Sequence, residues 1–300
     1  MSVEILLTGA NGQVGWEVER RAATHGVKVR ALARNELDIS DRAAVKHTIA
    51  EHAPKVVINA AAYTAVDKAE SEKDLAFAVN RDGAAHVAEA CAASGASLIH
   101  FSTDYVFDGA KSGPYVETDP VNPVSVYGAS KLAGEDAIRT AAPRHIILRT
   151  AWVYGVHGHN FVKTMLRLGR ERPELRVVDD QRGCPTFAGD LADAALALAR
   201  RALAGSMTEG GYGTFHCVGS GEVTWCGFTR KIIGLAGTRL GQTPKITAIT
   251  TADYPTPARR PANSVLDSTK LARVHGLTLR PWPEALAEML DTVLDGEQHK

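Results

Sequence analysis

A tyrosine and a lysine stand four residues apart in the stretch "VYGASKLAGE", at Tyr127 and Lys131. On a helix, a four-residue step places two side chains on the same face. A free tyrosine, with a pKa of about 10, is a poor acid at neutral pH, but a neighbouring lysine ammonium lowers that pKa. The pair can then supply the proton that reduction of a carbonyl needs. Taken alone, the spacing is common, and a solvated helix face explains it more simply.

Two hydroxyl side chains come shortly before this pair, in "HFSTDYVFDG". Ser102 and Thr103 end a predicted strand, and ligands of open α/β sheets bind at the carboxyl ends of the strands. The Thr103 hydroxyl can hydrogen-bond the same substrate oxygen as Tyr127. This order of residues favours the catalytic interpretation of Thr103, Tyr127 and Lys131.

A glycine-rich turn opens the chain, in "TGANGQVG". Gly9, Gly12 and Gly15 follow a predicted strand and begin a helix. Glycines allow the tight turn and let the backbone approach a pyrophosphate, which then lies at the helix N-terminus. This context predicts a dinucleotide-binding site.

The end of the second predicted strand bears on the choice of cofactor. NAD enzymes usually carry an acidic residue there, whereas this strand ends in Ala33-Arg34. An arginine suits a 2′-phosphate and favours NADPH, although Glu36 is close enough to leave NADH open. Asp38 either meets the adenine amine or caps the next helix.

The elements that must position these residues alternate along the first half of the chain. Apolar strands are predicted at 3–8, 27–33, 55–61, 96–103 and 144–155, with helical patterns between them. This alternation predicts an α/β fold, a Rossmann-like doubly wound parallel sheet with a smaller C-terminal α/β substrate lobe. We assign 1–155 to the dinucleotide-binding domain, with 186–205 returning to it, and 156–185 and 206–300 to the lobe.

Composition excludes several classes of protein. The 300 residues are 45% hydrophobic and 23% charged, with zero net charge and no basic run that would indicate nucleic-acid binding. The four cysteines, at 91, 184, 217 and 226, show no C-x-x-C spacing and indicate a reducing compartment. No apolar run approaches a membrane span, and the N-terminus lacks the features of a signal peptide. We therefore expect a cytoplasmic protein without a membrane partner.

These motifs together resemble the extended short-chain dehydrogenase/reductase superfamily and, within it, the dTDP-4-dehydrorhamnose reductase family. The matching segments span nearly the whole chain: "TGANGQVG", "NAAAYTAVDKAE", "STDYVFDG", "YGASKLAGE", "RTAWVYG", "NFV", "DQRGCPT" and "RPANSVLD". Ala151 stands where serine is frequent in the family, a substitution that we expect to be tolerated.

The resemblance implies a role for each matching residue. The catalytic residues would be Thr103, Tyr127 and Lys131. The cofactor would contact Gly9, Asn11, Gly12, Gln13, Val14, Gly15, Asp38, Ile39, Ala60, Ala61, Ala62, Tyr63, Tyr127 and Lys131, to which we add Arg34. The sugar nucleotide would contact Thr64, Val66, Thr103, Asp104, Tyr105 and Trp152, and we add Arg260 because a guanidinium binds phosphate oxygens bidentately.

The implied reaction is NADPH-dependent reduction of the C4 keto group of a dTDP-4-dehydro-6-deoxy sugar, giving dTDP-L-rhamnose. Some family members dimerise through a divalent ion, and Glu17 matches one of its ligands, so Mg²⁺ at a dimer contact is a further expectation. The resemblance leaves open a monomer or a homodimer.

Two other functions stay open. A nucleotide-sugar 4-ketoreductase or 4-epimerase of the same superfamily would share the Tyr–Lys pair. A 4,6-dehydratase is disfavoured, because it typically carries Asp-Glu after the strand-end threonine, where this chain has Asp104-Tyr105. A non-catalytic regulatory subunit like that of methionine adenosyltransferase would have the same fold, but the intact sugar-site motifs favour an enzyme.

Overall fold

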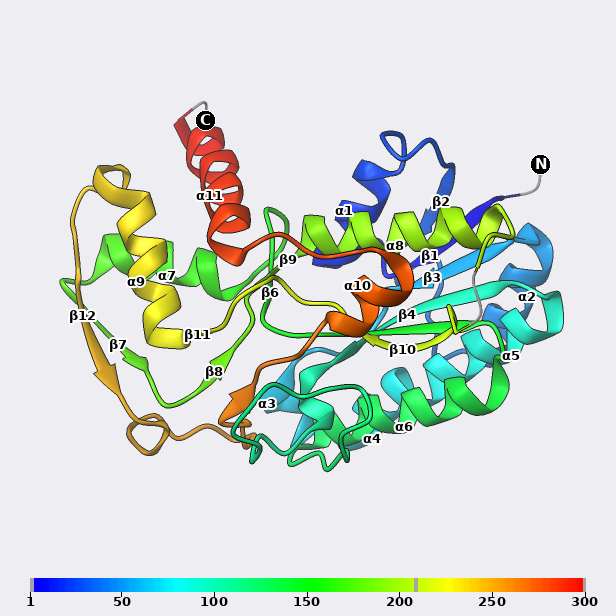
Figure 1. Ribbon diagram of the computed structural model, residues 1–300, viewed down its shortest axis with the longest axis horizontal. Coiled ribbons are helices and arrows are strands. Elements are labelled where there is room, and N and C mark those ends of the chain that lie inside the picture. Colours follow the sequence, from blue (N-terminus) through cyan, green and yellow to red (C-terminus); the bar gives the residue numbers. More distant parts are fainter. Residues whose placement is uncertain (1–2, 208–209, 299–300) are drawn as a thin grey trace.

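The apolar runs of the sequence form a six-stranded parallel sheet in the computed structural model, which describes residues 3–207 and 210–298 (Figure 1). Its strand order is β10-β5-β4-β3-β1-β2. The strands are β1 (Ile5–Thr8), β2 (Val29–Leu32), β3 (Val56–Asn59), β4 (Ser97–Thr103), β5 (His145–Thr150) and β10 (Gly213–His216). Every residue of β1, β3 and β4 is buried, as expected for strands covered on both faces. The direction of chain growth reverses at β1, where such folds bind ligands.

Helices cover both faces of this sheet. On one face, α1 (Gln13–Arg21) packs against α8 (Ala188–Leu203). The opposite face carries α2 (Arg42–His52), α5 (Ala84–Ser94) and α6 (Val126–Ala141) (Figure 1). A separate apolar cluster fills each interface. This arrangement confirms the predicted doubly wound α/β fold.

Helix α6 is held closely at its N-terminal half. The Ser125 hydroxyl caps it by accepting a hydrogen bond from the Gly128 amide, 3.2 Å away. A Cβ atom at Gly128 would collide with the Tyr105 carbonyl, and one at Gly134 would collide with the Asn80 carbonyl. Asn80 lies in the π-helical segment η1 (Ala78–Gly83) that leads into α5. These contacts fix the depth of the helix that carries Tyr127 and Lys131.

The second half of the chain builds a smaller lobe with its own apolar cluster. Its helices are α7 (Phe161–Glu171), α9 (Trp225–Ala236) and α11 (Trp282–Gln298). Its strands are β7 (Glu174–Val178) paired with β12 (Lys245–Ile249), β6 (Val153–Tyr154) with β9 (Thr186–Phe187), and β8 (Arg182–Gly183) between β11 (Val223–Thr224) and β13 (Asn263–Ser264). The remaining short elements are α3 (Val66–Ala69), α4 (Lys73–Phe77), η2 (Asp104–Val106), η3 (Gly237–Leu240), η4 (Thr251–Asp253) and α10 (Thr269–His275).

The chain crosses between sheet and lobe several times. Helix α8 returns to the sheet domain, within the segment 186–205 assigned to it. Strand β10 joins the sheet and helix α10 packs against it, although both fall within 206–300, the segment assigned to the lobe. In the described ranges, no helix is both long and apolar enough to span a bilayer.

Candidate active site

The glycine turn brings the end of β1 against the loop that follows β3. Gly9 has a φ of +77°, and a Cβ atom there would lie 2.6 Å from the Ala60 carbonyl carbon. Only glycine satisfies both constraints. Gly12 precedes α1 without a side-chain cap, so the first amides of the helix remain available to an anion.

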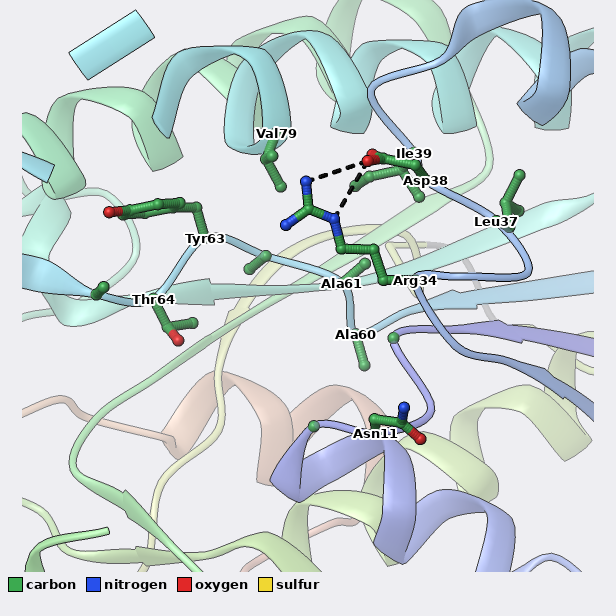
Figure 2. Close-up of a pocket in the computed structure, with 14 residues that line it drawn as sticks. Asn11, Arg34, Leu37, Asp38, Ile39, Ala60, Ala61, Tyr63, Thr64 and Val79 are labelled. Carbon is green, nitrogen blue, oxygen red and sulfur yellow. Dashed lines mark hydrogen bonds and ion pairs between the residues drawn. The ribbon is translucent and has the colours of Figure 1, made fainter. Parts of the chain in front are cut away.

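A cavity of about 300 Å³ opens beside this turn (Figure 2). It is lined by Gly9, Asn11, Gly12, Arg34, Leu37, Asp38, Ile39, Ala60, Ala61, Ala62, Tyr63, Thr64, Ala65 and Val79. Most of the predicted cofactor residues thus come together, with Leu37, Ala65 and Val79 added. Thr64, predicted for the sugar nucleotide, also lies here. Gln13 lies apart, where its Oε1 accepts a hydrogen bond from Asn160 Nδ2 at 3.1 Å.

Arg34 and Asp38 form an exposed ion pair at one side of this cavity. The Arg34 Nε donates to Asp38 Oδ2 at 3.2 Å. The amide and hydroxyl of Ser40 also donate to Asp38. The Ser40 hydroxyl and then Arg34 hold the pKa of Asp38 below its ordinary value. Arg34 lines the cavity as part of an exposed ion pair, whose guanidinium a phosphate oxygen could also reach.

Two hydroxyls meet at the carboxyl end of β4. The Tyr127 ring meets the Tyr105 ring edge-on, with centroids 5.5 Å apart, and the buried Thr103 hydroxyl lies near enough to the Tyr127 hydroxyl to affect its pKa. Burial raises the pKa of Tyr127 to about 12, and the Thr103 hydroxyl opposes this rise. The structure thus brings together two of the three predicted catalytic residues, Thr103 and Tyr127, at the end of β4.

Asp104 accepts a hydrogen bond from the Thr103 hydroxyl. Thr103 Oγ1 donates to Asp104 Oδ1 at 2.9 Å and accepts from the Tyr105 amide at 3.2 Å. Burial raises the pKa of Asp104 to about 6, although the nearby Ser264 and Thr103 hydroxyls oppose this rise. Asp104 thus controls which way the Thr103 hydroxyl points, and it lies next to one of the predicted catalytic residues.

Lys131 lies deeper than its predicted partner. Its Nζ is 2.7 Å from the Phe101 carbonyl oxygen and 3.1 Å from His100 Nε2. Burial lowers the pKa of Lys131 to about 8, although Glu135 opposes this shift. The predicted lowering of the Tyr127 pKa by Lys131 is not seen: burial raises that pKa, and Lys131, bound to Phe101 and His100, is not among the groups that shift it. His100, which sequence reasoning missed, reads in "SLIHFST" as an ordinary core position.

A second cavity, of about 490 Å³, separates Tyr105 from the lobe. It is lined by Tyr105, Phe161, Thr164, Met165, Leu168, Arg172, Leu175, Arg176, Val177, Val178, Gln181, Trp225, Tyr254, Thr256 and Arg260. It therefore combines apolar and aromatic walls with guanidinium groups, which suits a nucleotide. Tyr105 and Arg260 were predicted; Arg172 and Arg176 were missed, because in "ERPELRVV" they read as solvated charges.

The other predicted sugar-site residues lie at the edges of this cavity or apart from it. Arg260 Nη2 donates to Asp67 Oδ2 at 2.8 Å, so its charge is shared with a carboxylate of α3. Val66 begins the same short helix. Trp152, with a positive φ of 49°, stacks on Trp225 with centroids 3.4 Å apart. Trp225, not Trp152, lines the cavity.

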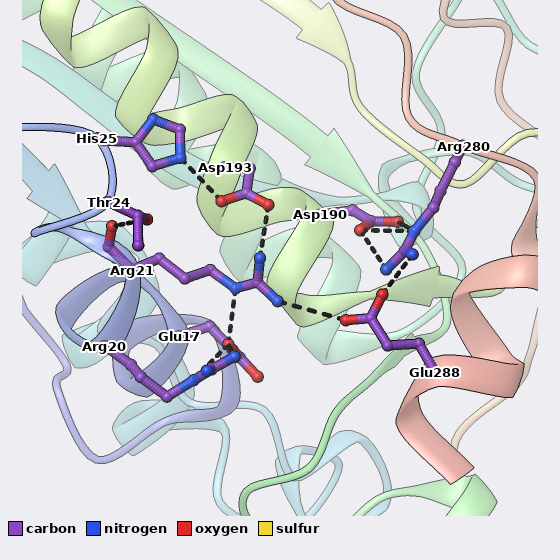
Figure 3. Close-up of polar contacts among 9 residues, drawn as sticks. All are labelled: Glu17, Arg20, Arg21, Thr24, His25, Asp190, Asp193, Arg280 and Glu288. Carbon is purple, nitrogen blue, oxygen red and sulfur yellow. Dashed lines mark hydrogen bonds and ion pairs between the residues drawn. The ribbon is translucent and has the colours of Figure 1, made fainter. Parts of the chain in front are cut away.

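Glu17, the predicted metal ligand, is already bound by two arginines (Figure 3). Its Oε2 accepts from Arg20 Nη2 at 2.8 Å and from Arg21 Nε at 2.9 Å, and its other oxygen, Oε1, is buried and unpaired. Arg21 also bonds Asp193 of α8 and lies 3.8 Å from Glu288 of α11. Across the described parts of the chain, no three His, Cys, Asp or Glu side chains group to hold a metal ion. These residues do not fit the expected Mg²⁺ site, because the guanidinium groups of Arg20 and Arg21 already occupy the place beside Glu17 that a cation would take.

Comparison with known proteins decides the family. A model of the RmlD substrate binding domain matches residues 3–294, and the dTDP-4-dehydrorhamnose reductase of Sinorhizobium fredii is 47% identical over 97% of this chain and 98% of its own. The chain belongs to the dTDP-4-dehydrorhamnose reductase family. It is accordingly an oxidoreductase, as its sequence indicated.

Solved structures of dTDP-4-dehydrorhamnose reductases have the same fold. The enzyme from Clostridium acetobutylicum superimposes with a TM-score of 0.90 at 42% identity, covering 97% of this chain and 99% of that one. The enzyme from Bacillus anthracis, solved in complex with NADP, has a TM-score of 0.89 at 36% identity, covering 97% of this chain and 100% of that one. The family resemblance drawn from the motifs is confirmed.

Proposed function

We propose that this protein reduces the C4 keto group of dTDP-4-dehydro-6-deoxy-L-mannose with NADPH and forms dTDP-L-rhamnose. The observation that carries the proposal is the meeting of the Thr103 and Tyr127 hydroxyls at the end of β4, beside Tyr105 of the second cavity. The NADP complex of the Bacillus anthracis relative supports the choice of cofactor.

The residues of the first cavity fit a dinucleotide. Gly9 leaves room where a Cβ atom would collide with the loop after β3, and the N-terminus of α1 offers free amides to the pyrophosphate. Arg34 would meet a 2′-phosphate at the exposed side of the cavity. NADPH, when bound, would supply the hydride that the reduction needs.

Tyr127 supplies the proton. As hydride reaches C4, the carbonyl oxygen gains negative charge, and the Tyr127 hydroxyl protonates it. The Thr103 hydroxyl, which lies near the tyrosine hydroxyl, aligns it with that oxygen. Lys131, when protonated, stabilises the phenolate that is left behind. The reaction thus adds one hydride and one proton to the ketone.

The second cavity supplies specificity for the nucleotide. Its arginines, Arg172, Arg176 and Arg260, are placed to pair with a diphosphate, and Trp225 and Phe161 offer flat apolar surfaces to a base or a sugar. Tyr105 stands where a dehydratase carries glutamate, so the site lacks the base that elimination of water requires. These features favour plain reduction of a nucleotide-linked keto sugar.

NADPH oxidation tests the proposal directly. The purified protein is mixed with NADPH and dTDP-4-dehydro-6-deoxy-D-glucose, with and without a separate 3,5-epimerase, and the loss of NADPH absorbance is followed. Oxidation only in the presence of the epimerase is expected, because the epimerase generates the L-configured substrate. Equal oxidation without it would identify the D-configured sugar as the substrate, and no oxidation in either case would overturn the proposal.

A further inference from the structure

A chain of buried polar groups runs beneath the active site from β1 to α6. Thr8 Oγ1 donates to Asn59 Oδ1 at 2.8 Å, Asn59 Nδ2 lies 3.1 Å from His100 Nδ1, and His100 Nε2 lies 3.1 Å from Lys131 Nζ. These side chains are at most 2% exposed. The proposed reaction uses only Lys131, so the roles of Asn59 and His100 need an explanation.

A backbone amide determines which groups donate and which accept along this series of hydrogen bonds. The Ala61 N–H can only donate, and it lies 3.1 Å from Asn59 Oδ1. The oxygen of the Asn59 side chain must therefore face Ala61, which leaves its NH₂ group facing His100 Nδ1. His100 Nδ1 must accept this hydrogen bond. A neutral imidazole that accepts at Nδ1 carries its proton on Nε2.

The proton on His100 Nε2 determines the protonation state of Lys131. The His100 Nε2–H points at Lys131 Nζ, and an ammonium, which only donates, would oppose it. An uncharged amine instead accepts the bond with its lone pair and donates to the Phe101 carbonyl at 2.7 Å. A charged imidazole is excluded by its surroundings, since burial alone holds the pKa of His100 below its ordinary value.

We infer that His100 is a positioning residue whose orientation, imposed by Ala61 through Asn59, holds Lys131 as an uncharged amine at mildly alkaline pH in the enzyme without ligands. Lys131 then does not carry a permanent charge; it must take up a proton before it can stabilise the Tyr127 phenolate. The consequence for turnover rests on the proposed function, whereas the proton arrangement itself does not.

The charged groups around Lys131 agree with this inference. Glu135, one turn along α6, attracts a proton to Lys131. Its oxygens, however, already accept from Arg149 of β5 and Ser102 of β4, which offset its negative charge. Tyr127, one turn earlier on α6, is uncharged over the same range of pH because burial raises its pKa. His100 of β4 is neutral, so burial of Lys131 is the dominant influence on its protonation.

Nitrogen NMR of the ligand-free protein with ¹⁵N-labelled histidine tests the arrangement. Protonated and bare ring nitrogens have well-separated shifts, and His100 is assigned by the signals that disappear in His100→Gln. We expect Nε2 to carry the proton and Nδ1 to be bare at mildly alkaline pH, above about pH 8, where Lys131 is uncharged. A proton on Nδ1 with Nε2 bare, or a doubly protonated ring, would overturn the inference.

Two variants test whether Asn59 sets the direction. Asn59→Asp replaces the donor by an acceptor, so the His100 proton should move to Nδ1 and Nε2 should accept from Lys131. Thr8→Val removes the other donor to Asn59 Oδ1 but leaves the Ala61 amide, so the proton should stay on Nε2. Melting curves establish that both variants fold. A folded Asn59→Asp protein that keeps Nε2–H would refute the role of Asn59.

Turnover gives a separate measurement. In the wild type, kcat/KM should fall as the pH rises through about 8, where Lys131 loses its proton. In Asn59→Asp this fall should move to higher pH by about one unit, a tenfold gain in proton affinity, and in Thr8→Val it should not move. An unmoved profile in Asn59→Asp would overturn the link to turnover. If no keto sugar is reduced at all, the proposed function fails, and the NMR result still decides the proton arrangement.

Discussion

Arg149 and Glu135 form a buried ion pair behind the helix that carries the catalytic tyrosine. Arg149 Nη2 lies 2.7 Å from Glu135 Oε2, and Arg149 Nε lies 2.9 Å from Glu135 Oε1. Both side chains are at most 2% exposed. The pair joins α6 to β5 and holds the pKa of Glu135 below its ordinary value. It therefore fixes the position of Tyr127 and Lys131 relative to the strand ends.

Removal of one partner should be costly. Arg149→Met leaves a carboxylate buried without its bidentate partner, so the free energy of unfolding should fall by about 3–5 kcal/mol. Arg139→Met, the matched control, removes a partner of the same carboxylate that is 35% exposed and should cost less than about 1 kcal/mol. Urea unfolding of both variants gives the comparison. Equal losses would show that the buried pair does not stabilise the fold.

Tyr127→Phe should abolish most turnover. The change removes one oxygen and leaves the ring against Tyr105, so kcat should fall by about 10²–10⁴-fold, the usual contribution of a general acid. Binding of NADPH, followed by quenching of protein fluorescence, should be nearly unchanged. Turnover close to that of the wild type would mean that another group protonates the substrate.

Arg34→Ala should weaken the preference for NADPH over NADH. Loss of a charge-assisted hydrogen bond of about 1.5–3 kcal/mol corresponds to about a 10- to 100-fold change in relative kcat/KM. Arg30→Ala is the control, because Arg30 is a similarly exposed arginine of β2 that pairs with Glu36 and lies outside the cavity. A preference that survives in Arg34→Ala but changes in Arg30→Ala would contradict the assignment.

Mg²⁺ should leave the protein unaffected. Because Arg20 and Arg21 already bind Glu17, neither Mg²⁺ nor EDTA should shift the melting temperature or the oligomeric state in sedimentation. Arg21→Gln should lower the melting temperature more than Arg20→Gln, since Arg21 also joins Asp193 and approaches Glu288. Dimerisation that requires Mg²⁺ would restore the metal site that the structure disfavours.

The parts of this structure that could be predicted depend on local signals. Gly9 indicates a tight turn in the sequence, because two backbone segments can approach so closely only at glycine. The alternating apolar runs predict the order of strands and helices. Strand β10 was missed because "GTFH" is too short to show a period.

The site residues that the sequence did not predict depend on contacts between segments far apart in the sequence. His100 meets Asn59 and Lys131 only after β3, β4 and α6 have packed together. Arg172 becomes a cavity residue only when the lobe faces Tyr105. A single sequence carries no signal of such pairings, so these residues read as ordinary core and surface positions.

Asp104 should make stability depend on pH in a direction opposite to that of most carboxylates. Burial raises its pKa to about 6 in the folded protein, so the folded state binds the proton more tightly than the unfolded state. Its contribution therefore stabilises the fold as the pH falls through about 6, is complete below about 4, and is lost again as the pH rises. Asp104→Asn removes this contribution while keeping the shape of the side chain. The difference in unfolding free energy between wild type and variant should change in favour of the wild type by about 2.5 kcal/mol between pH 7 and pH 4; a constant difference across that range would show that Asp104 titrates normally.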